Sequence, residues 1–347
     1  MNGDPVGSAK AEEPQPKTGE PQPEEAAGSM GERRLRLAGW LFAIAAVLFA
    51  GTMLVVEVGP PSEAELREQA GLIGKKSLRI GVKYDTPGIA RVDSTGEVSG
   101  FDIDIALLIA ADLGFRPDQV EFLEIETEDR ARMRAKNRQG EYVTVDLVVA
   151  TFSVTPERRA EASVGFSTPY LHTEQSVVTL AGHPPISSLH QLRGKKVCTL
   201  GTSTSESELV KAGAEVTGMN RISECMEGLE NGDYEAVSTD AAILAGFVAE
   251  SDGKLAHFDI GLAETEMWAV NTGSNTALGT LVELALYRSY ADPQDQRWEE
   301  AYKKHIGPLL KANPGIDVAG SEQPCVNEPD VRRWPWEYAV STPPCQR

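Results

Sequence analysis

An apolar run from Leu37 to Val56 constrains this chain more than any other feature of its sequence. The run holds twenty residues and no charged side chain. A helix rises about 1.5 Å per residue, so this run would extend about 30 Å, the thickness of the hydrocarbon core of a bilayer. Three arginines at positions 33, 34 and 36 precede it, and Trp40 lies near the same end, where interfacial aromatic residues are common. We therefore predict a transmembrane helix at residues 37–56.

The arginines also set the expected orientation. Cationic residues beside a membrane span stay in the cytoplasm, so the chain after Val58 is expected outside it. Residues 1–36 are rich in Pro, Glu, Gly and Ala without an apolar period, which predicts a disordered cytoplasmic leader. A buried core helix would show a polar face, and the run has none; a cleaved secretion signal is the other alternative, although such signals are usually shorter. We expect a single-pass protein of the cell membrane with an uncleaved signal-anchor.

Four cysteines follow the apolar run, in the part of the chain expected outside the reducing cytosol. Four cysteines permit three pairings, and free buried thiols are the alternative to all of them. Each couple lies within one stretch of sequence, so the simplest arrangement joins Cys198 to Cys225 and Cys325 to Cys345. The second bridge would staple a loop-rich C-terminal tail at residues 313–347.

Composition excludes several classes of function. The formal net charge is −19, from 33 basic and 52 acidic residues, which argues against nucleic-acid binding because that binding needs a basic face. The five histidines and four cysteines show no zinc-binding spacing, and no phosphate-binding loop motif occurs. We therefore expect no metal and no cofactor.

After a linker at residues 57–76, strand-like and helix-like segments alternate. Short apolar strands are predicted at residues 78–82, 146–150, 176–180, 194–201 and 236–240, and helices at 101–113, from 203–205 onward, and at 299–310. Alternation of this kind predicts an α/β fold with mainly parallel sheets, and two separate series predict two lobes.

Polar residues occur at five places that we interpret as strand ends, which is where open α/β sheets bind ligands. These segments are residues 83–85, 100–102, 150–158, 201–204 and 239–240. Together they supply an arginine and hydroxyls for a carboxylate, an aspartate for an ammonium group, and aromatic side chains. This set has the parts needed to hold a zwitterion.

Five sequence motifs occur in a fixed order along this region. They are Gly-Val-Lys-Tyr-Asp (81–85), Gly-Phe-Asp-Ile-Asp-Ile-Ala (100–106), the stretch from Val145 to Arg159, Phe-Ser-Thr-Pro-Tyr (166–170) and Thr-Asp-Ala-Ala-Ile-Leu (239–244). In this order they resemble the amino-acid branch of the bacterial extracytoplasmic solute-binding proteins, the polar amino-acid uptake family (family 3), and within it the glutamate/aspartate-binding branch. The resemblance runs from about Leu78 to about Leu310. It implies a two-lobed periplasmic-binding-protein-like (type II) fold with two crossovers, here preceded by one transmembrane helix. Lobe 1 would comprise residues 77–178 and 268–312, and lobe 2 residues 183–264.

The resemblance also implies roles for individual residues. Arg158 would grip the α-carboxylate of an amino acid, assisted by the helix start at Thr202, Ser203 and Thr204. Asp240 would pair with the α-ammonium, while Thr151 and Ser153 would contact either group. Phe101 would pack against the aliphatic part of the ligand. Each residue also has a purely structural alternative: a helix cap for Asp240, a strand-end hydroxyl for Thr151, the core for Phe101, and an ion pair with Glu157 or Glu161 for Arg158.

Two further cations indicate the ligand. Lys83 ends the first strand, where relatives that bind basic or amide side chains tend to carry an acidic residue, and Arg130 aligns with an arginine of acidic-amino-acid receptors. A buried cation needs a partner, so we predict L-glutamate or L-aspartate, with glutamate favoured by the longer reach. The alternative is that both cations are solvated residues at the lip of the cleft.

The sequence departs from the family pattern at two places within this region. Extra, basic-rich residues lie between Arg130 and Asp146, and the stretch from Glu264 to Asn271 lacks the glycine usual at the return crossover.

The main hypothesis is a receptor for amino-acid uptake by an ABC permease. A tethered sensor with a membrane or cytoplasmic signalling partner is an alternative that the sequence leaves open. The other alternative is an extracytoplasmic enzyme on the same fold, a dehydratase or a cell-wall lytic enzyme. No histidine lies in a strand-end motif, and the acids there have better binding or capping roles, so we expect no catalysis.

Overall fold

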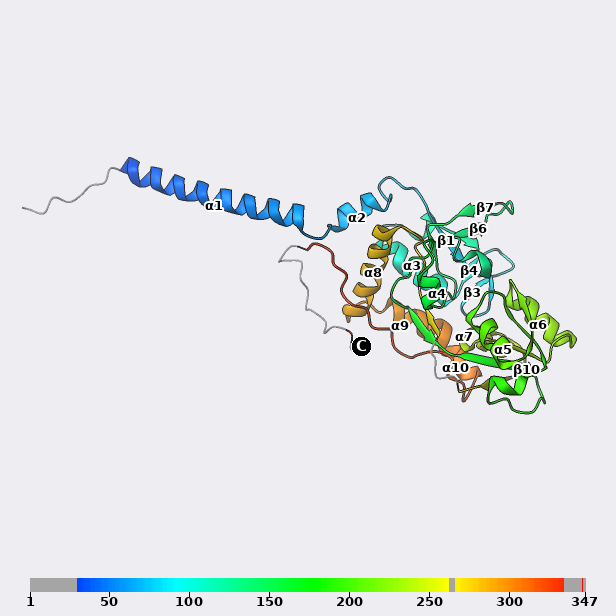
Figure 1. Cartoon of the computed structure of the whole chain (residues 1–347). Coiled ribbons are helices and arrows are strands. Elements are labelled where there is room, and N and C mark those ends of the chain that lie inside the picture. Colours follow the sequence, from blue (N-terminus) through cyan, green and yellow to red (C-terminus); the bar gives the residue numbers. More distant parts are fainter. Residues whose placement is uncertain (1–29, 262–265, 334–344, 346–347) are drawn as a thin grey trace, which may run out of the picture. The chain divides into compact units, whose positions relative to one another are not determined.

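The computed structural model describes residues 30–261, 266–333 and 345 (Figure 1). The chain divides into two units, Met1–Gly59 and Pro60–Arg347. Within the first unit, the described residues form one helix, α1 (Met30–Val58). The stretch Arg33–Met53 is long and apolar enough to cross a membrane. Large apolar side chains such as Leu41, Phe42 and Phe49 are exposed on it, as lipid contact requires.

The start of α1 corrects one prediction. Residues 30–36 are helical, although their composition predicted that they belong to a disordered leader. Arginine and leucine favour the helix, and no proline separates these residues from the apolar run, so the helix extends toward the N-terminus. The rest of the predicted leader, residues 1–29, lies outside the described residues.

The second unit contains two five-stranded sheets, one in each lobe, which confirms the predicted two-lobed α/β fold. The first sheet has the order β7-β6-β5-β1-β8, with bounds β1 (Leu78–Val82), β5 (Val120–Glu124), β6 (Arg134–Lys136), β7 (Tyr142–Thr144) and β8 (Leu147–Val148). β1 pairs in parallel with both β5 and β8. β6 and β7 form an antiparallel hairpin at the sheet edge, and this hairpin accounts for the extra residues between Arg130 and Asp146.

The second sheet has the order β12-β11-β13-β10-β14. Its strands are β10 (Gln175–Leu180), β11 (Lys196–Leu200), β12 (Glu215–Met219), β13 (Ala236–Asp240) and β14 (Leu255–Asp259). β11 is parallel to β12 and β13, whereas β10 is antiparallel to β13 and β14.

The helices and the short elements complete the unit. The helices are α2 (Glu63–Gln69), α3 (Phe101–Asp112), α4 (Pro156–Arg159), α5 (Thr204–Ala212), α6 (Ile222–Asn231), α7 (Ala241–Glu250), α8 (Thr276–Ala291), α9 (Arg297–Ala301) and α10 (Gly307–Ala312), with a π-helical turn at Tyr302–Ile306. The short strands are β2 (Asp85–Thr86), β3 (Ala90–Val92) and β4 (Val98–Ser99), which form a small antiparallel sheet.

The two crossovers are β9 (Leu171–Thr173) and β15 (Glu266–Trp268), which pair antiparallel with each other. The chain therefore leaves the first lobe at β9, and β10 belongs to the second sheet. The predicted lobe boundary after residue 178 is wrong, because only Glu174 separates β9 from β10 and no glycine or proline marks the change of sheet.

Both predicted disulfides are present. Cys198–Cys225 joins β11 to α6, and Cys325–Cys345 closes a loop in the C-terminal segment. That segment is more than a stapled tail, because Val318 and Val326 are buried in the core and Thr173 Oγ1 donates to the carbonyl oxygen of Val318 (2.6 Å). Residues 334–344 lie outside the described residues.

Candidate functional site

A pocket between the two lobes gathers seven of the ten predicted ligand-binding residues. Its first-lobe wall consists of Arg130, Thr151, Ser153 and Arg158, and its second-lobe wall of Leu200, Ser203, Thr204, Thr239, Asp240 and Ile243. The cavity measures about 10 Å³, room for roughly one water molecule. The lobes are therefore closed on each other, and an amino acid would enter only if they separate.

Arg158 reaches across this pocket. It lies in the short helix α4, where the hydroxyl of Thr155 accepts its backbone N–H. The guanidinium donates to the carbonyl oxygens of Ser153 in the first lobe (2.6 Å) and Thr202 in the second (2.9 Å). Burial lowers its pKa, and among the described residues its guanidinium bonds to these two carbonyl oxygens and forms no ion pair within 4.0 Å. The predicted alternative, an ion pair with Glu157 or Glu161, is therefore not what holds it.

Arg130 is almost fully buried beside it. Its guanidinium donates to the carbonyl oxygens of Thr127 (3.1 Å), Ala150 (3.1 Å) and Thr151 (2.8 Å). The guanidinium carbons of Arg130 and Arg158 each lie 4.8 Å from the centroid of the Phe152 ring, so one aromatic side chain supports both cations. Burial, followed by the charge of Arg158, lowers the pKa of Arg130 to about 9, which leaves it charged at neutral pH.

Asp240 supplies the negative charge of the pocket. It ends β13 and precedes α7, but its side chain makes no capping hydrogen bond, so the predicted alternative of a helix cap does not apply. One carboxylate oxygen, Oδ2, accepts the indole N–H of Trp268 at 2.5 Å. Burial and then the charge of Glu266 raise the pKa of Asp240 to about 7, against the opposing effects of Trp268, Arg130 and Arg158.

Thr151 carries a hydroxyl that is buried without a hydrogen-bond partner among the described residues. Its φ of 48° is rare for a residue with a side chain, and its backbone N–H donates to Asp102 Oδ2 (3.1 Å). The other oxygen of Asp102 accepts the hydroxyl of Tyr170 (2.9 Å). Asp102 thus fixes an unusual backbone geometry that leaves the Thr151 hydroxyl available to a polar ligand.

The helix N-terminus predicted at Ser203 is also present. Ser203 is the N-cap of α5, and its hydroxyl accepts the backbone N–H of Glu206 (3.1 Å). The hydroxyl is therefore used in capping, while the start of the helix presents partial positive charge to the pocket.

The family model for bacterial extracellular solute-binding proteins, family 3, matches residues 78–308. The chain belongs to this family. Glutamate-binding protein GluB of Corynebacterium efficiens is 31% identical over 234 residues, covering 64% of this chain and 77% of that protein. The ABC transporter glutamine-binding protein GlnH of Bacillus subtilis is 30% identical over 277 residues, covering 77% of this chain and 97% of that protein.

Two further similarities, one to an amino-acid-binding protein and one to an enzyme, show that proteins of different function resemble this chain. An ancestral arginine-binding protein bound to glutamine has a TM-score of 0.58 at 29% identity, covering 67% of this chain and 98% of its own. Membrane-bound lytic murein transglycosylase F of Ectopseudomonas mendocina is 28% identical over 284 residues, which cover 80% of this chain and 54% of that protein. This family 3 chain thus spans about half of the lytic enzyme and nearly all of the glutamine-binding protein.

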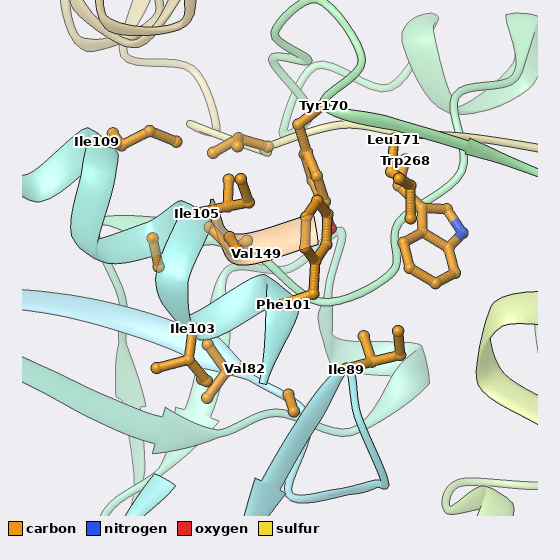
Figure 2. Packing of buried hydrophobic residues seen from close by; sticks show 14 of the residues in the cluster. Val82, Ile89, Phe101, Ile103, Ile105, Ile109, Val149, Tyr170, Leu171 and Trp268 are labelled. Atoms are coloured by element: carbon orange, nitrogen blue, oxygen red, sulfur yellow. The ribbon is translucent and has the colours of Figure 1, made fainter. Parts of the chain in front are cut away.

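Three predicted binding residues of this solute-binding protein lie elsewhere. Phe101 is fully buried in the core, where its ring packs beside Tyr170 (Figure 2). The ring also packs edge-on to Trp298. It follows Gly100, whose φ of 139° and close approach to the carbonyl oxygen of Ile89 turn the helix start inward. The predicted ligand contact of Phe101 is therefore replaced by a core role, one of the alternatives that the sequence left open.

Thr202 and Lys83 are the other two. Thr202 lines a neighbouring cavity of about 410 Å³ and offers only its carbonyl oxygen to Arg158. Lys83 is buried between the lobes, where its ammonium donates to Thr127 Oγ1 (3.1 Å) and to the carbonyl oxygen of Asn220 (3.0 Å). Lys83 therefore neither lines the pocket, as a ligand contact would, nor lies in solvent at the lip of the cleft.

Sequence reasoning missed two residues of the site, Phe152 and Trp268. Phe152 lies between Thr151 and Ser153 in a recognised motif, and an aromatic ring there was a signal for a stacked cation. Trp268 lies in the return crossover between the lobes. A buried indole needs an acceptor for its N–H, so a tryptophan at this place could have indicated a polar partner in the cleft.

Proposed function

We propose that this chain is a membrane-anchored extracytoplasmic receptor that binds an amino acid, L-glutamate or L-aspartate, by closing its two lobes around it. The single observation that carries the proposal is the charge set of the pocket: two arginines and one aspartate converge there. Arg158 pairs with the α-carboxylate and Asp240 with the α-ammonium, which leaves Arg130 for a second carboxylate.

Charge balance supports an acidic ligand. The pocket carries one net positive charge when Asp240 is ionised, and glutamate or aspartate carries one net negative charge. A neutral ligand such as glutamine would leave Arg130 without a counterion in a buried site, which is costly. Lys83 has no part in this argument, because its ammonium is bound between the lobes outside the pocket. One relative is named for glutamate and another for glutamine, and both amino acids are similar in size to the ligands that we propose.

Arg130 has a donor left for this role. Its Nε and Nη1 donate to backbone carbonyls, whereas Nη2 has no acceptor within the part of the chain that the structure describes. The hydroxyl of Thr151 is equally available. A side-chain carboxylate of the ligand would satisfy both groups at once, which is the physical reason to expect glutamate or aspartate.

The partner we propose is an ABC permease, with a signalling protein as the alternative. A receptor held in the membrane by α1 would present its lobes beside such a partner. We propose further that the chain is not an enzyme. Among the described residues, Asp240 is the acid that lines the pocket, and the buried Asp102 next to it is committed to Tyr170 and Thr151.

Isothermal titration calorimetry on the full chain in detergent micelles tests the proposal. We expect glutamate or aspartate to bind more tightly than glutamine, arginine or cysteine. The variant Arg130→Met should weaken glutamate at least tenfold and glutamine less, because only glutamate loses a charge-assisted hydrogen bond. Arg132→Met is the matched control, since its guanidinium is 57% exposed and pairs with Glu128 and Asp129 instead.

Tighter binding of glutamine or arginine than of glutamate would show that the ligand assignment is wrong. Turnover of prephenate, arogenate or peptidoglycan that Asp240→Asn abolishes would instead favour the enzyme alternative.

A further inference from the structure

Trp268 connects the return crossover to the charged pocket. The residue ends β15, is fully buried, and its backbone bridges to Ser153 in the pocket wall. The indole ring packs against Tyr170, with 6.5 Å between ring centroids. Figure 2 shows its nitrogen pointing away from the apolar cluster that contains Phe101. The ring therefore packs with apolar neighbours while its N–H reaches the Asp240 carboxylate, 2.5 Å away.

This hydrogen bond engages only one oxygen of Asp240. Oδ2 accepts the indole N–H, and within the described part of the chain Oδ1 has a single distant hydrogen bond, from the Thr239 hydroxyl at 3.5 Å. The hydrogen bond from Trp268 fixes Oδ2, and the Asp240 side chain does not cap α7. Oδ1 of Asp240 is therefore held at a defined position in the pocket.

The groups around Asp240 act in opposite directions on its charge. Arg130 and Arg158 favour the ionised carboxylate, whereas burial and Glu266 favour the protonated one. A hydrogen bond donated to a carboxylate favours the ionised form. The N–H of Trp268 therefore acts with the two arginines in favour of the charged form of Asp240, against burial and Glu266.

We propose that Trp268 is a positioning residue of the amino-acid site, whose indole N–H holds Asp240 ionised and oriented so that Oδ1 receives the ligand's α-ammonium. This role rests on the proposed function, because it assigns the α-ammonium to Asp240. An uncharged or misdirected Asp240 would still fill the same space but would bind a primary ammonium poorly. Trp268 would thus set the selectivity for α-amino acids over analogues that lack the amino group.

The first test needs no ligand. It uses the NMR spectrum of the full chain labelled with [15N]tryptophan. The indole N–H resonance that disappears in the variant Trp268→Phe belongs to Trp268. That resonance should shift with pH as Asp240 takes up a proton, and Asp240→Asn should remove the shift. The Trp298 indole, which donates to the backbone carbonyl of Tyr170, should not follow this titration. If the chemical shift of the Trp268 indole N–H changes neither with pH nor in Asp240→Asn, the proposal is wrong, whichever ligand the protein binds.

The second test measures amino-acid affinity against pH. Trp268→Phe keeps a ring and removes the N–H, so we expect about tenfold weaker binding at pH 7. The loss of affinity on acidification should also move about one pH unit higher, since one unit corresponds to that tenfold change. Trp298→Phe is the matched control, because it removes another buried indole N–H that donates to the Tyr170 carbonyl instead of Asp240, and it should leave the midpoint in place. Glu266→Gln should move the midpoint lower.

An unchanged midpoint in Trp268→Phe would contradict the positioning role even if overall affinity fell. A wild-type chain that binds no amino acid would reject the proposed function, and the indole titration would still decide whether Trp268 controls Asp240.

Discussion

The ammonium group of Lys83, at the end of a first-lobe strand, lies 3.0 Å from the carbonyl oxygen of Asn220 in the second lobe. The same carbonyl accepts the hydroxyl of Thr127 (3.1 Å), and Asp85 accepts both the backbone N–H and the hydroxyl of Ser223 (3.1 Å each). These bonds join the lobes outside the amino-acid pocket. Closure is therefore stabilised by a second set of contacts, in which Lys83 is the buried cation.

The first prediction concerns the pH dependence of closure. Burial lowers the pKa of Lys83 to about 8, from a usual value of about 10.5 when the lobes separate and expose it. The closed state thus binds fewer protons than the open state between these values, and closure becomes more favourable as pH rises above about 8. We expect amino-acid affinity to increase by up to about tenfold from pH 7 to pH 9, measured by calorimetry.

Lys83→Met should remove this rise while keeping an apolar side chain of similar length. Lys75→Met is the control, because Lys75 pairs with Asp146 within the first lobe. A rise of equal size in Lys83→Met would show that another group is responsible.

The second prediction concerns Asp102 and stability. Burial raises the pKa of Asp102 to about 7, well above the value of about 3.9 expected in the unfolded chain. The folded state therefore binds more protons between these values, so the Asp102 contribution to the free energy of unfolding falls as pH rises from about 4 to about 7. In urea unfolding at pH 4.5 to 7.5, Asp102→Asn should lose that slope relative to the wild-type chain.

Asp295→Asn provides the comparison. Hydrogen bonds from the Arg297 guanidinium lower the pKa of Asp295, with burial opposing them, and arginine stays charged throughout this pH range. The Asp295 contribution to stability is complete above the unfolded pKa, so this variant should change the free energy of unfolding by about the same amount at each pH in that range. Equal slopes in both variants would contradict the assignment to Asp102.

The third prediction separates the two disulfides. Cys198–Cys225 closes a loop of 27 residues between β11 and α6, and both cysteines are fully buried. Replacing both by alanine should lower the free energy of unfolding by about 2–4 kcal/mol, measured by urea titration under oxidising conditions. The pair Cys325→Ala and Cys345→Ala should cost less, because that bridge lies at the C-terminal end and leaves both sheets intact. Larger losses from the second pair would mean that the C-terminal segment supports the lobes more than its contacts indicate.

The fourth prediction concerns the anchor. The full-length chain should remain in membranes washed with alkaline carbonate. Leu48→Arg places a charge near the middle of the span at a cost of about 2.5–3.5 kcal/mol and should increase extraction. Leu35→Arg, near the end where arginines already lie, is the control. A mature N-terminus after Gly51 would show that the segment is a cleaved signal.

Local sequence alone determined several features of this protein. The apolar run specifies a long helix because its composition allows little else, and the spacing of the cysteines indicated the pairing that the fold contains. The strand-end motifs predicted that Thr151, Arg158 and Asp240 come together, and all three line one pocket, because the carboxyl ends of strands converge in an open α/β sheet.

Only the tertiary structure decided the roles of Lys83, Phe101 and Trp268. Lys83 and Phe101 lie within motifs and Trp268 lies outside them. Each side chain is amphipathic or apolar, and local sequence does not say which neighbours from distant segments surround it. The Lys83 ammonium donates a hydrogen bond to the carbonyl of Asn220, 137 residues away in sequence. The Trp268 indole, in the return crossover, donates to Asp240 at the end of a strand of the second sheet. Such contacts depend on how the lobes close. The cleft residues were therefore predictable from strand ends, whereas the bonds that hold the cleft shut and orient its aspartate follow from packing.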